Sequence, residues 1–355
     1  MAYLTLANGD VYAGESFGAR GDSTGIVVFN TGMTGYLEAL TDPSYYEQIV
    51  MMTYPLIGNI GVNWQDPESP RPQISGLIAR ELCETPSNWF SEGSLNAYLT
   101  RHGIVGIQGI DTRALTRRLR SLGETAGIIT QLPATLQQLE ACRAFKIYRP
   151  IVKVTCEEAF EVPGPGLHIG VLDFGVKASI LSSLRKRGCR ITVYPALTDP
   201  EEILAAGHDG LLLTNGPGNP ADHTQIIKNI RRLAGKLPTM GICIGHSILA
   251  LACGAKTAPL PFGHRGTNHP VKDLRHDRVY ITSQNHGHAV QEEGLPANMR
   301  VFMRSWNDRS IEGIQYTDFP AFTVQFHPEA SPGPRDTGYL FDEFLRMAEA
   351  SHAER

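Results

Sequence analysis

The chain has 355 residues, which is enough for two domains of ordinary size. Hydrophobic residues make up 42% and charged residues 19%, a composition typical of a globular protein with a sizeable core. The formal net charge of −4, with both signs mixed along the chain, argues against a nucleic-acid-binding surface. The longest apolar stretches are far too short to cross a bilayer, and the first residues show no signal-peptide pattern.

Cysteine usage points to the compartment. The six cysteines are scattered and contain no Cys-x-x-Cys pair. This pattern suits free thiols in a reducing environment better than disulfides or a zinc site. We therefore expect a cytoplasmic protein.

The first part of the chain reads as β-rich. Asn8 and Gly9 stand between alternating apolar positions in "LTLANGDVYAG", which predicts a hairpin. Short β-like runs broken by glycine and proline follow. A helix is predicted in "DTRALTRRLRSLG", with Asp111 as its N-cap and Gly123 as its stop.

The segment "CEEAFEVPGPG", residues 156–166, is acidic and then rich in proline and glycine, which favours a linker. After it, short apolar strands alternate with helices, and later strands and a closing helix follow. Strands that alternate with helices predict an α/β domain with a mostly parallel sheet covered on both faces. The expected divisions are a smaller β-rich α/β domain at 1–150, a linker at 151–166 and an α/β domain at 167–355.

A cysteine stands at a predicted join between a buried strand and a helix, in "PTMGICIGHSILALACGAK", residues 238–256. A tight strand-to-helix turn between Gly241 and Gly245 pushes Cys243 out over the carboxyl edge of the sheet, the arrangement called a nucleophile elbow. The helix N-terminus behind it offers backbone N–H groups that can hold a developing oxyanion. We predict that Cys243 is a catalytic nucleophile, whereas Cys253, in the following helix, is a core residue.

A thiol nucleophile needs a base, and the base needs an orienting group. The segment "VQFHPEA" supplies both at the end of another predicted strand, as His327 and Glu329. Residues two apart in an extended segment point the same way, and Pro328 stiffens the segment between them. Glu329 is therefore expected to hold one imidazole nitrogen of His327 while Cys243 faces the other.

These motifs resemble those of class I, triad-type glutamine amidotransferases, through "GICIGH", "HPE" and the upstream "TNGPGNP". Over nearly its full length the chain also resembles the small, glutamine-hydrolysing subunits of carbamoyl-phosphate synthases. That likeness rests on segments found in order, "FNTGMTGYLEALTDPSYYEQIV", "TYPLIGN", "GIDTRALTRRLR", "LLLTNGPGNP", "FGHRGTNHPVKD", "ITSQNHGHAV" and "QFHPEASPGP". It implies hydrolysis of glutamine to glutamate and ammonia through a γ-glutamyl thioester.

The resemblance also assigns roles to residues. Cys243 is the implied nucleophile, His327 the general base and then acid, and Glu329 the orienting carboxylate. Backbone N–H groups of the "NGPGNP" loop and of the residue after the cysteine are implied to form the oxyanion hole. The residues implied to contact the substrate are Ser44, Gly216, Gly218, Ile244, Ser247, Asn285, Gly287 and His288.

The chain departs from the family pattern at three places. Ser247 stands where the elbow usually continues with a glutamine whose amide helps hold the amino-acid end of the substrate. Loss of one hydrogen bond to a charged group costs ~1.5–3 kcal/mol, or about ten- to hundred-fold in binding. Ser247 is therefore a tolerated variant with weaker glutamine affinity, an engineered change, or a sign of a damaged glutaminase. His288 replaces an aromatic residue, and Asn219 replaces an aspartate; both changes look mild.

Four histidines, His264, His269, His286 and His288, raise the question of a metal site. Their spacings fit no zinc template, so we predict no metal on this chain. The sequence contains neither a GxxxxGK[ST] motif nor a GxGxxG opening a helix, so ATP and Mg²⁺ are expected on another chain. The resemblance implies that this other chain is the carbamoyl-phosphate synthase large subunit, which would form a heterodimer with the present chain and receive ammonia from it.

Two other functions stay open. One is a glutaminase that serves a different acceptor, such as an anthranilate- or GMP-type synthase, against which the N-terminal motifs speak. The other is a weakened or inactive glutaminase that acts as a scaffold or regulator of an ammonia-using synthase, against which the intact triad speaks. The sequence does not separate arginine from pyrimidine biosynthesis.

Overall fold

The computed structural model describes residues 1–353, and the chain divides into two compact units, Met1–Tyr148 and Arg149–Arg355. The segment expected as a linker at 151–166 is largely part of the second unit. It contains most of helix α5 (Pro150–Val154) and strand β10 (Phe160–Val162), which pairs with strand β12. All three residues of β10 pair with β12 at the edge of the sheet. The acidic and Pro/Gly-rich composition around them gave no sign of a strand in the sequence.

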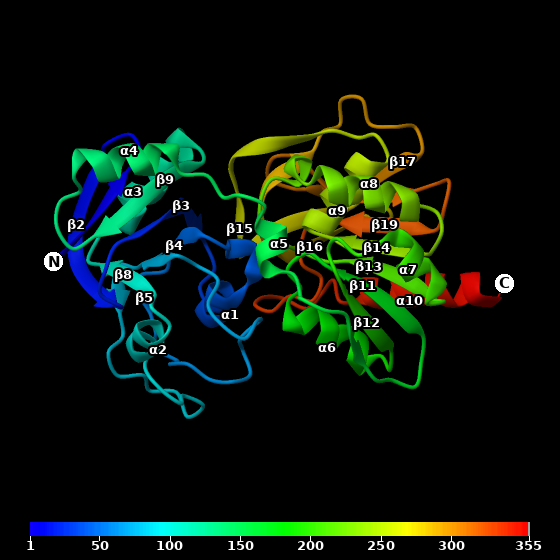
Figure 1. Cartoon of the computed structure of the whole chain (residues 1–355), viewed down its shortest axis with the longest axis horizontal. Coiled ribbons are helices and arrows are strands. Elements are labelled where there is room, and N and C mark those ends of the chain that lie inside the picture. Colours follow the sequence, from blue (N-terminus) through cyan, green and yellow to red (C-terminus); the bar gives the residue numbers. More distant parts are fainter. Residues whose placement is uncertain (354–355) are drawn as a thin grey trace. The chain divides into compact units, whose positions relative to one another are not determined.

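The first unit is built around a closed barrel in the strand order β1-β2-β8-β6-β4-β3-β9 (Figure 1). Its helices pack on the strands, with Leu37 of α1 and Leu99 of α2 in one core cluster with Val50 of β4. The elements are β1 (Ala2–Leu6), β2 (Val11–Gly18), β3 (Ser23–Asn30), α1 (Tyr36–Thr41), the 3₁₀ turn η1 (Pro43–Tyr45), β4 (Gln48–Met52), β5 (Leu56–Ile57), β6 (Gly76–Ile78), β7 (Glu81–Leu82), α2 (Leu95–Arg101), β8 (Val105–Gln108), α3 (Thr112–Leu122), β9 (Thr125–Thr130) and α4 (Leu136–Ala144).

The two local predictions in this unit are confirmed. Strands β1 and β2 form an antiparallel hairpin, and Gly9 adopts a left-handed φ of 96° in the turn between them. Helix α3 begins after Asp111, whose side chain accepts a hydrogen bond from the N–H of Ala114 at 2.9 Å, and it ends before Gly123. Both features depend only on neighbouring residues.

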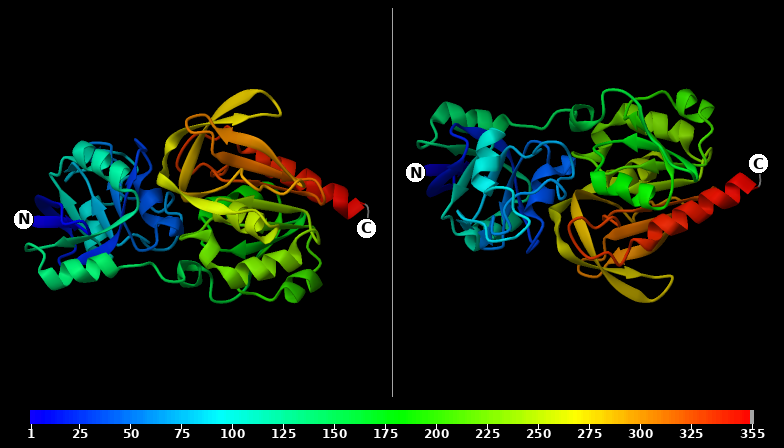
Figure 2. Two further views of the ribbon diagram at one scale, coloured as in Figure 1. Left: turned by 90° about the horizontal axis from the view of Figure 1, so that it is seen from above. Right: turned by 90° about the horizontal axis from the view of Figure 1, so that it is seen from below.

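The second unit contains one sheet in the order β10-β12-β11-β13-β14-β19-β18-β17-β15-β16. Its remaining elements are β11 (His168–Asp173), α6 (Ala178–Lys186), β12 (Arg190–Pro195), α7 (Pro200–Ala205), β13 (Gly210–Leu213), η2 (Pro220–Asp222), α8 (Thr224–Leu233), β14 (Thr239–Ile242), α9 (Ile244–Ala252), β15 (Thr257–Asp273), β16 (Arg278–Val290), β17 (Met299–Ser305), β18 (Ile311–Tyr316), β19 (Ala321–Val324) and α10 (Tyr339–Ala353). Figure 2 shows β15 and β16, coloured yellow to gold, running side by side as a long pair.

This sheet is mixed rather than parallel throughout. The expected parallel pairing is present from β12 through β11, β13 and β14 to β19. The strands from β15 to β18 pair antiparallel with their neighbours. No helix stands between β15 and β19, and a parallel connection needs a crossover of a dozen or more residues.

Both faces of this sheet are covered. Leu211 and Leu213 of β13 lie in a core cluster with residues of α7, α8 and α9, whereas Leu212 lies in a second cluster with α6 and α10 (Figure 1). Successive side chains of a strand point to opposite faces, so a strand that is apolar at every position serves both layers. Within residues 1–353, no helix is both long enough and apolar enough to span a membrane.

Close packing at the start of α9 gives a test of this fold. A Cβ atom at Gly245 would lie 2.4 Å from the backbone oxygen of Leu213, which cannot rotate away. We expect Gly245→Ala to lower the free energy of unfolding by at least ~1–3 kcal/mol, measured by thermal unfolding followed by circular dichroism. Gly93→Ala is the control, because a Cβ there meets only Val62 Cγ2 at 3.7 Å. Equal melting temperatures for the two variants would contradict the packing described here.

Candidate active site

Cys243 occupies a strained turn at the carboxyl end of β14. It stands between β14 and α9 with φ 55° and ψ −109°, a left-handed φ that a residue with a side chain rarely adopts. Such a conformation costs about 1–3 kcal/mol and is held by its surroundings. Here the N–H of Cys243 donates to the oxygen of Val324 at 2.9 Å, and the N–H of Gly245 donates to the oxygen of Thr214 at 3.1 Å. The elbow predicted from the sequence is therefore present.

The neighbouring strands place their ends beside this turn. β13, β14 and β19 are adjacent and parallel, so their carboxyl ends meet at one edge of the sheet. The loop after β13 carries Gly216, where a Cβ would lie 2.0 Å from the oxygen of Phe174, and Gly218, which has a φ of 95°. Ile244 begins α9, a position whose N–H has no partner within the helix. The oxyanion hole expected from these backbone groups stays a prediction.

His327 and Glu329 follow β19 at the same edge. Nδ1 of His327 and Oε1 of Glu329 are 2.7 Å apart, and both side chains are buried. The N–H of His327 donates to the oxygen of Ser283 on β16 at 2.9 Å, which holds the segment in place. The predicted imidazole–carboxylate pair is thus formed.

A buried lysine lies on the other side of Glu329 and forms a row of three charged groups with Glu329 and His327. Nζ of Lys177, just before α6, lies 2.9 Å from Oε1 of Glu329, and their side chains are 3% and 0% exposed. The same ammonium donates to the oxygen of Ser331 at 2.6 Å. Our sequence analysis did not single out Lys177. The only sign in the sequence that Lys177 belongs to the site was its place shortly after β11, whose carboxyl end lies at the same edge of the sheet. That sign is weak, because a lysine before a helix is usually solvated.

The contacts among Lys177, Glu329 and His327 determine which of these side chains are charged. Burial opposes the charged form of His327, but Glu329 and then Cys243 outweigh it and raise the pKa of His327 to about 10. Burial likewise opposes ionisation of Glu329, but Lys177 and His327 lower the pKa of that carboxyl to about 2. At neutral pH a carboxylate therefore lies between an ammonium and an imidazolium.

The sulfur lies within electrostatic reach of the imidazole. Cys243 is among the groups that raise the pKa of His327, yet Nε2 of His327 has no partner with full hydrogen-bond geometry among the described residues. The thiol instead donates to the backbone oxygen of Asn285, with Sγ and O 3.5 Å apart. Nε2 is therefore available to a reacting group placed beside the sulfur.

The residues expected to contact the amino-acid end of the substrate lie on two elements of the second unit, α9 and β16, and in the first unit. Ser247 is buried in the first turn of α9, and its hydroxyl donates to Oε1 of Gln325 at 3.3 Å. Asn285, Gly287 and His288 lie on β16, which passes beside the cysteine at Asn285. The backbone oxygen of His288 accepts a hydrogen bond from His286, so its carbonyl is already engaged.

Two further expectations have different outcomes. Ser44 belongs to the first unit, where it lies in η1 with its N–H donating to Oδ1 of Asp42 at 2.9 Å, and its part in the site stays a prediction. Cys253 is not inside α9 but caps its end, and it is only partly buried. All six cysteines have free thiols, as expected. Among the described residues, His264, His286 and Glu312 form a group with a metal-ligand composition, where the sequence predicted no metal.

Known proteins resemble both units. The family "Carbamoyl-phosphate synthase small chain, CPSase domain" matches residues 4–129, and "Glutamine amidotransferase class-I" matches residues 170–347. The carbamoyl phosphate synthase small chain of Symbiobacterium thermophilum is 49% identical over 356 residues, covering 98% of each chain. That of Bacillus caldolyticus is 50% identical, covering 97% of this chain and 95% of its own. A relative from Halalkalibacterium halodurans, 47% identical over 98% of this chain and 97% of its own, is named a pyrimidine-specific small chain. Because similarity at this level spans both units, the chain belongs to the carbamoyl phosphate synthase small chain family.

Proposed function

We propose that this chain hydrolyses L-glutamine to glutamate and ammonia and passes the ammonia to a carbamoyl phosphate synthase large subunit. The observation that carries the proposal is the buried His327–Glu329 pair, beside a cysteine held in a strained strand-to-helix turn. A thiol nucleophile requires such a base and such an orienting group.

The chemistry follows from the charges. The reactive form of Cys243 is the thiolate, which forms when the thiol gives up its hydrogen bond to Asn285. Its Sγ, beside the His327 imidazolium, attacks the side-chain amide carbon of glutamine. The oxyanion is held by backbone N–H groups of Ile244 and of the loop at 216–218. When the carbon–nitrogen bond breaks, His327 gives its proton to the departing nitrogen, which leaves as ammonia, and a γ-glutamyl thioester remains on the sulfur.

The second half returns the site to its starting state. Nε2 of His327, now neutral, takes a proton from a water molecule that attacks the thioester carbon. The carbon–sulfur bond breaks, glutamate is released, and the thiolate is again paired with the imidazolium. Throughout, Lys177 and Glu329 fix the orientation of the ring, because Glu329 accepts from both Nζ and Nδ1.

The acceptor of the ammonia is proposed to be on the large subunit. That subunit would use ATP, Mg²⁺ and bicarbonate, and this chain would carry no cofactor for the reaction. An enclosed path between the subunits would keep ammonia from being protonated and lost. We place the heterodimer in the cytoplasm, where free thiols persist.

The central test is a glutaminase assay with and without the large subunit. We expect slow glutamate release from the isolated chain, faster release from the complex with ATP, and a fall of more than ~1,000-fold in Cys243→Ala. Cys253→Ala serves as the matched control and should keep the activity of the parent. A complex that makes carbamoyl phosphate from ammonia yet releases no glutamate would instead identify this chain as a scaffold.

Position 247 offers a second test. A serine hydroxyl bonded to Gln325 leaves one fewer donor for the charged end of the substrate. Ser247→Gln should lower the KM for glutamine, by up to ~10- to 100-fold, with little change in kcat. Ser247→Ala is the control, since it removes the hydroxyl without adding an amide. An unchanged or higher KM in Ser247→Gln would refute this role.

Lys177 allows a third test. Lys177→Met leaves the buried Glu329 carboxylate without its ammonium, which should cost about 3–5 kcal/mol of stability at pH 7 in urea unfolding. The pKa of Glu329 is lowered to about 2 from an ordinary 4.5, so the stabilisation is complete above pH 4.5 and is lost as the pH falls towards 2. The difference between parent and variant should therefore shrink in that window.

The matched control for Lys177→Met is Arg190→Gln. Arg190 pairs with Glu161 at the surface, where the side chains are 47% and 55% exposed. Such exposed pairs contribute about 0–1 kcal/mol. Equal losses in the two variants would show that Glu329 does not depend on Lys177.

A further inference from the structure

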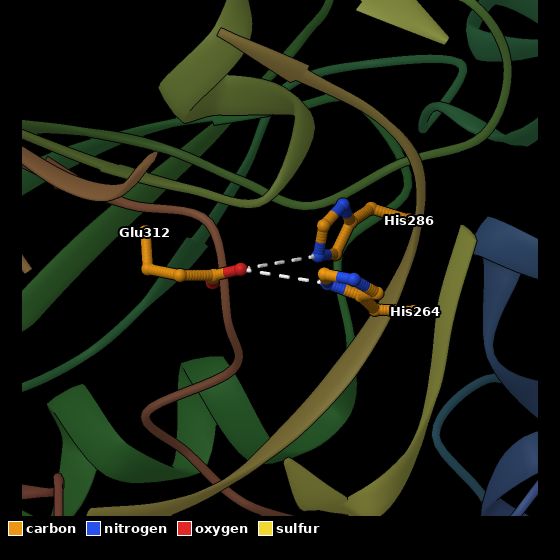
Figure 3. A group of neighbouring side chains, drawn as sticks. All are labelled: His264, His286 and Glu312. Atoms are coloured by element: carbon orange, nitrogen blue, oxygen red, sulfur yellow. Dashed lines mark ion pairs between the residues drawn. The ribbon is translucent and has the colours of Figure 1, made fainter. Parts of the chain in front are cut away.

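Three buried side chains converge beside the candidate active site, from strands β15, β16 and β18. His264, His286 and Glu312 point toward one another, and their ligand atoms all lie within 4.8 Å of one another (Figure 3). Nδ1 of His264 is 3.6 Å and Nε2 of His286 is 3.8 Å from Oε1 of Glu312. The sequence predicted no metal here because histidine spacing alone did not include Glu312.

The hydrogen-bond network fixes which nitrogen of His286 carries the proton. Nδ1 lies 2.9 Å from the backbone oxygen of His288, which can only accept, so Nδ1–H donates to it. In the neutral ring Nε2 then carries a lone pair, directed at Oε1 of Gln284 at 3.1 Å and at Glu312.

The amide of Gln284 cannot turn to supply a proton. The hydroxyl of Thr282 donates to the oxygen of His269 at 2.8 Å, so the same hydroxyl oxygen is left to accept from Nε2 of Gln284 at 3.2 Å. Turning the amide would set its carbonyl oxygen against that hydroxyl oxygen. Gln284 therefore presents its carbonyl oxygen to His286, and two electron-rich atoms face each other.

His264 repeats the pattern. Its Nε2 lies 2.9 Å from Oδ2 of Asp308, a carboxylate whose pKa is held far below its usual range first by this contact with His264. Nε2–H donates to it, and Nδ1 faces Glu312 without a hydrogen-bond partner among the described residues. Oε2 of Glu312, which is also fully buried, likewise has none among them. With both imidazoles neutral, lone pairs thus converge on one buried point. The hydroxyl of Ser310 lies 3.5 Å from Oε1 of Glu312 but only 2.8 Å from Oδ1 of Asp308, to which it donates.

We propose that this point binds a divalent transition-metal cation of the zinc type, through Nδ1 of His264, Nε2 of His286 and the carboxylate of Glu312. Two imidazoles and a carboxylate are a zinc-type donor set, and the carbonyl oxygen of Gln284 adjoins it as a fourth donor. Asp308 orients His264 as carboxylates orient metal-bound imidazoles. A charge of +2 offsets the two carboxylates, Asp308 and Glu312, and Arg265 is a further cation near His286.

A proton is the competing occupant. The pKa of His264 is raised to about 9, against burial, by Asp308 and then Glu312, so an imidazolium can also bridge the two carboxylates. It would leave the lone pair on Nε2 of His286 facing the carbonyl oxygen of Gln284 at 3.1 Å. A metal satisfies both histidines at once.

The cation would stabilise the part of β16 that passes the nucleophile. His286 lies between Asn285, whose oxygen accepts from Cys243, and Gly287. Fixing His286 fixes the position of these two neighbours. The role is structural, and it does not rest on the proposed glutaminase activity.

The test uses the full-length Cys243→Ser chain, so that the thiol of the active site cannot bind the metal. After treatment with a chelator, the protein is titrated with Co²⁺ and followed by visible absorption, and then with Zn²⁺ and followed by melting temperature. We expect one Co²⁺ per chain, no sulfur-to-cobalt charge-transfer band, displacement by Zn²⁺ and a higher melting temperature. Elemental analysis of the parent purified without chelator should show zinc.

Variants separate this site from surface binding. Glu312→Gln should weaken Co²⁺ binding by at least about 100-fold, and Asp308→Asn by about 10- to 100-fold. His276→Asn is the control, because His276 pairs with Asp273 at 2.9 Å and its side chain is 56% exposed. Absence of stoichiometric binding by the folded parent chain, or binding that survives Glu312→Gln, overturns the proposal and leaves the proton as the occupant.

Discussion

The buried row of charges from Lys177 through Glu329 to His327 is the interaction on which the rest of the site depends. Each charge is costly to bury alone, and each becomes tolerable only because the next one lies 2.9 Å or less away. Glu329 remains ionised because two cations face it, and an ionised Glu329 holds the imidazole charged and correctly turned. In the proposed function, the reactivity of Cys243 therefore depends on a lysine whose ammonium is bonded to Glu329.

The sheet supplies the geometry that this row requires. Parallel pairing brings the ends of β13, β14 and β19 to one edge, although the segments that follow these strands lie far apart in the chain. Glycines permit the close approach, since side chains at Gly216 and Gly245 would collide with backbone oxygens. The strain at Cys243 is thus held by ordinary packing on both sides of the turn.

Strand β16 links the features of the site. Ser283 accepts the N–H of His327, Asn285 accepts the thiol of Cys243, and Gln284 and His286 turn toward Glu312. Ser283 and Asn285 make these contacts through backbone oxygens, whereas Gln284 and His286 use their side chains, so one strand serves the nucleophile and the histidine cluster at once. Anything that fixes this strand also fixes the surroundings of the sulfur.

The sequence by itself determined those features whose causes are local: the caps of α3, the hairpin at Gly9, the elbow at Cys243 and the pairing of His327 with a carboxylate two residues away. Only the tertiary structure decided which strands run antiparallel after α9, that part of the expected linker joins the sheet as β10, and that Lys177 reaches Glu329 across 152 residues of chain. It also brought Glu312 to two histidines on other strands. The physical reason is that these contacts depend on strand order and register, which the packing of both sheet faces selects and which no short stretch of sequence encodes.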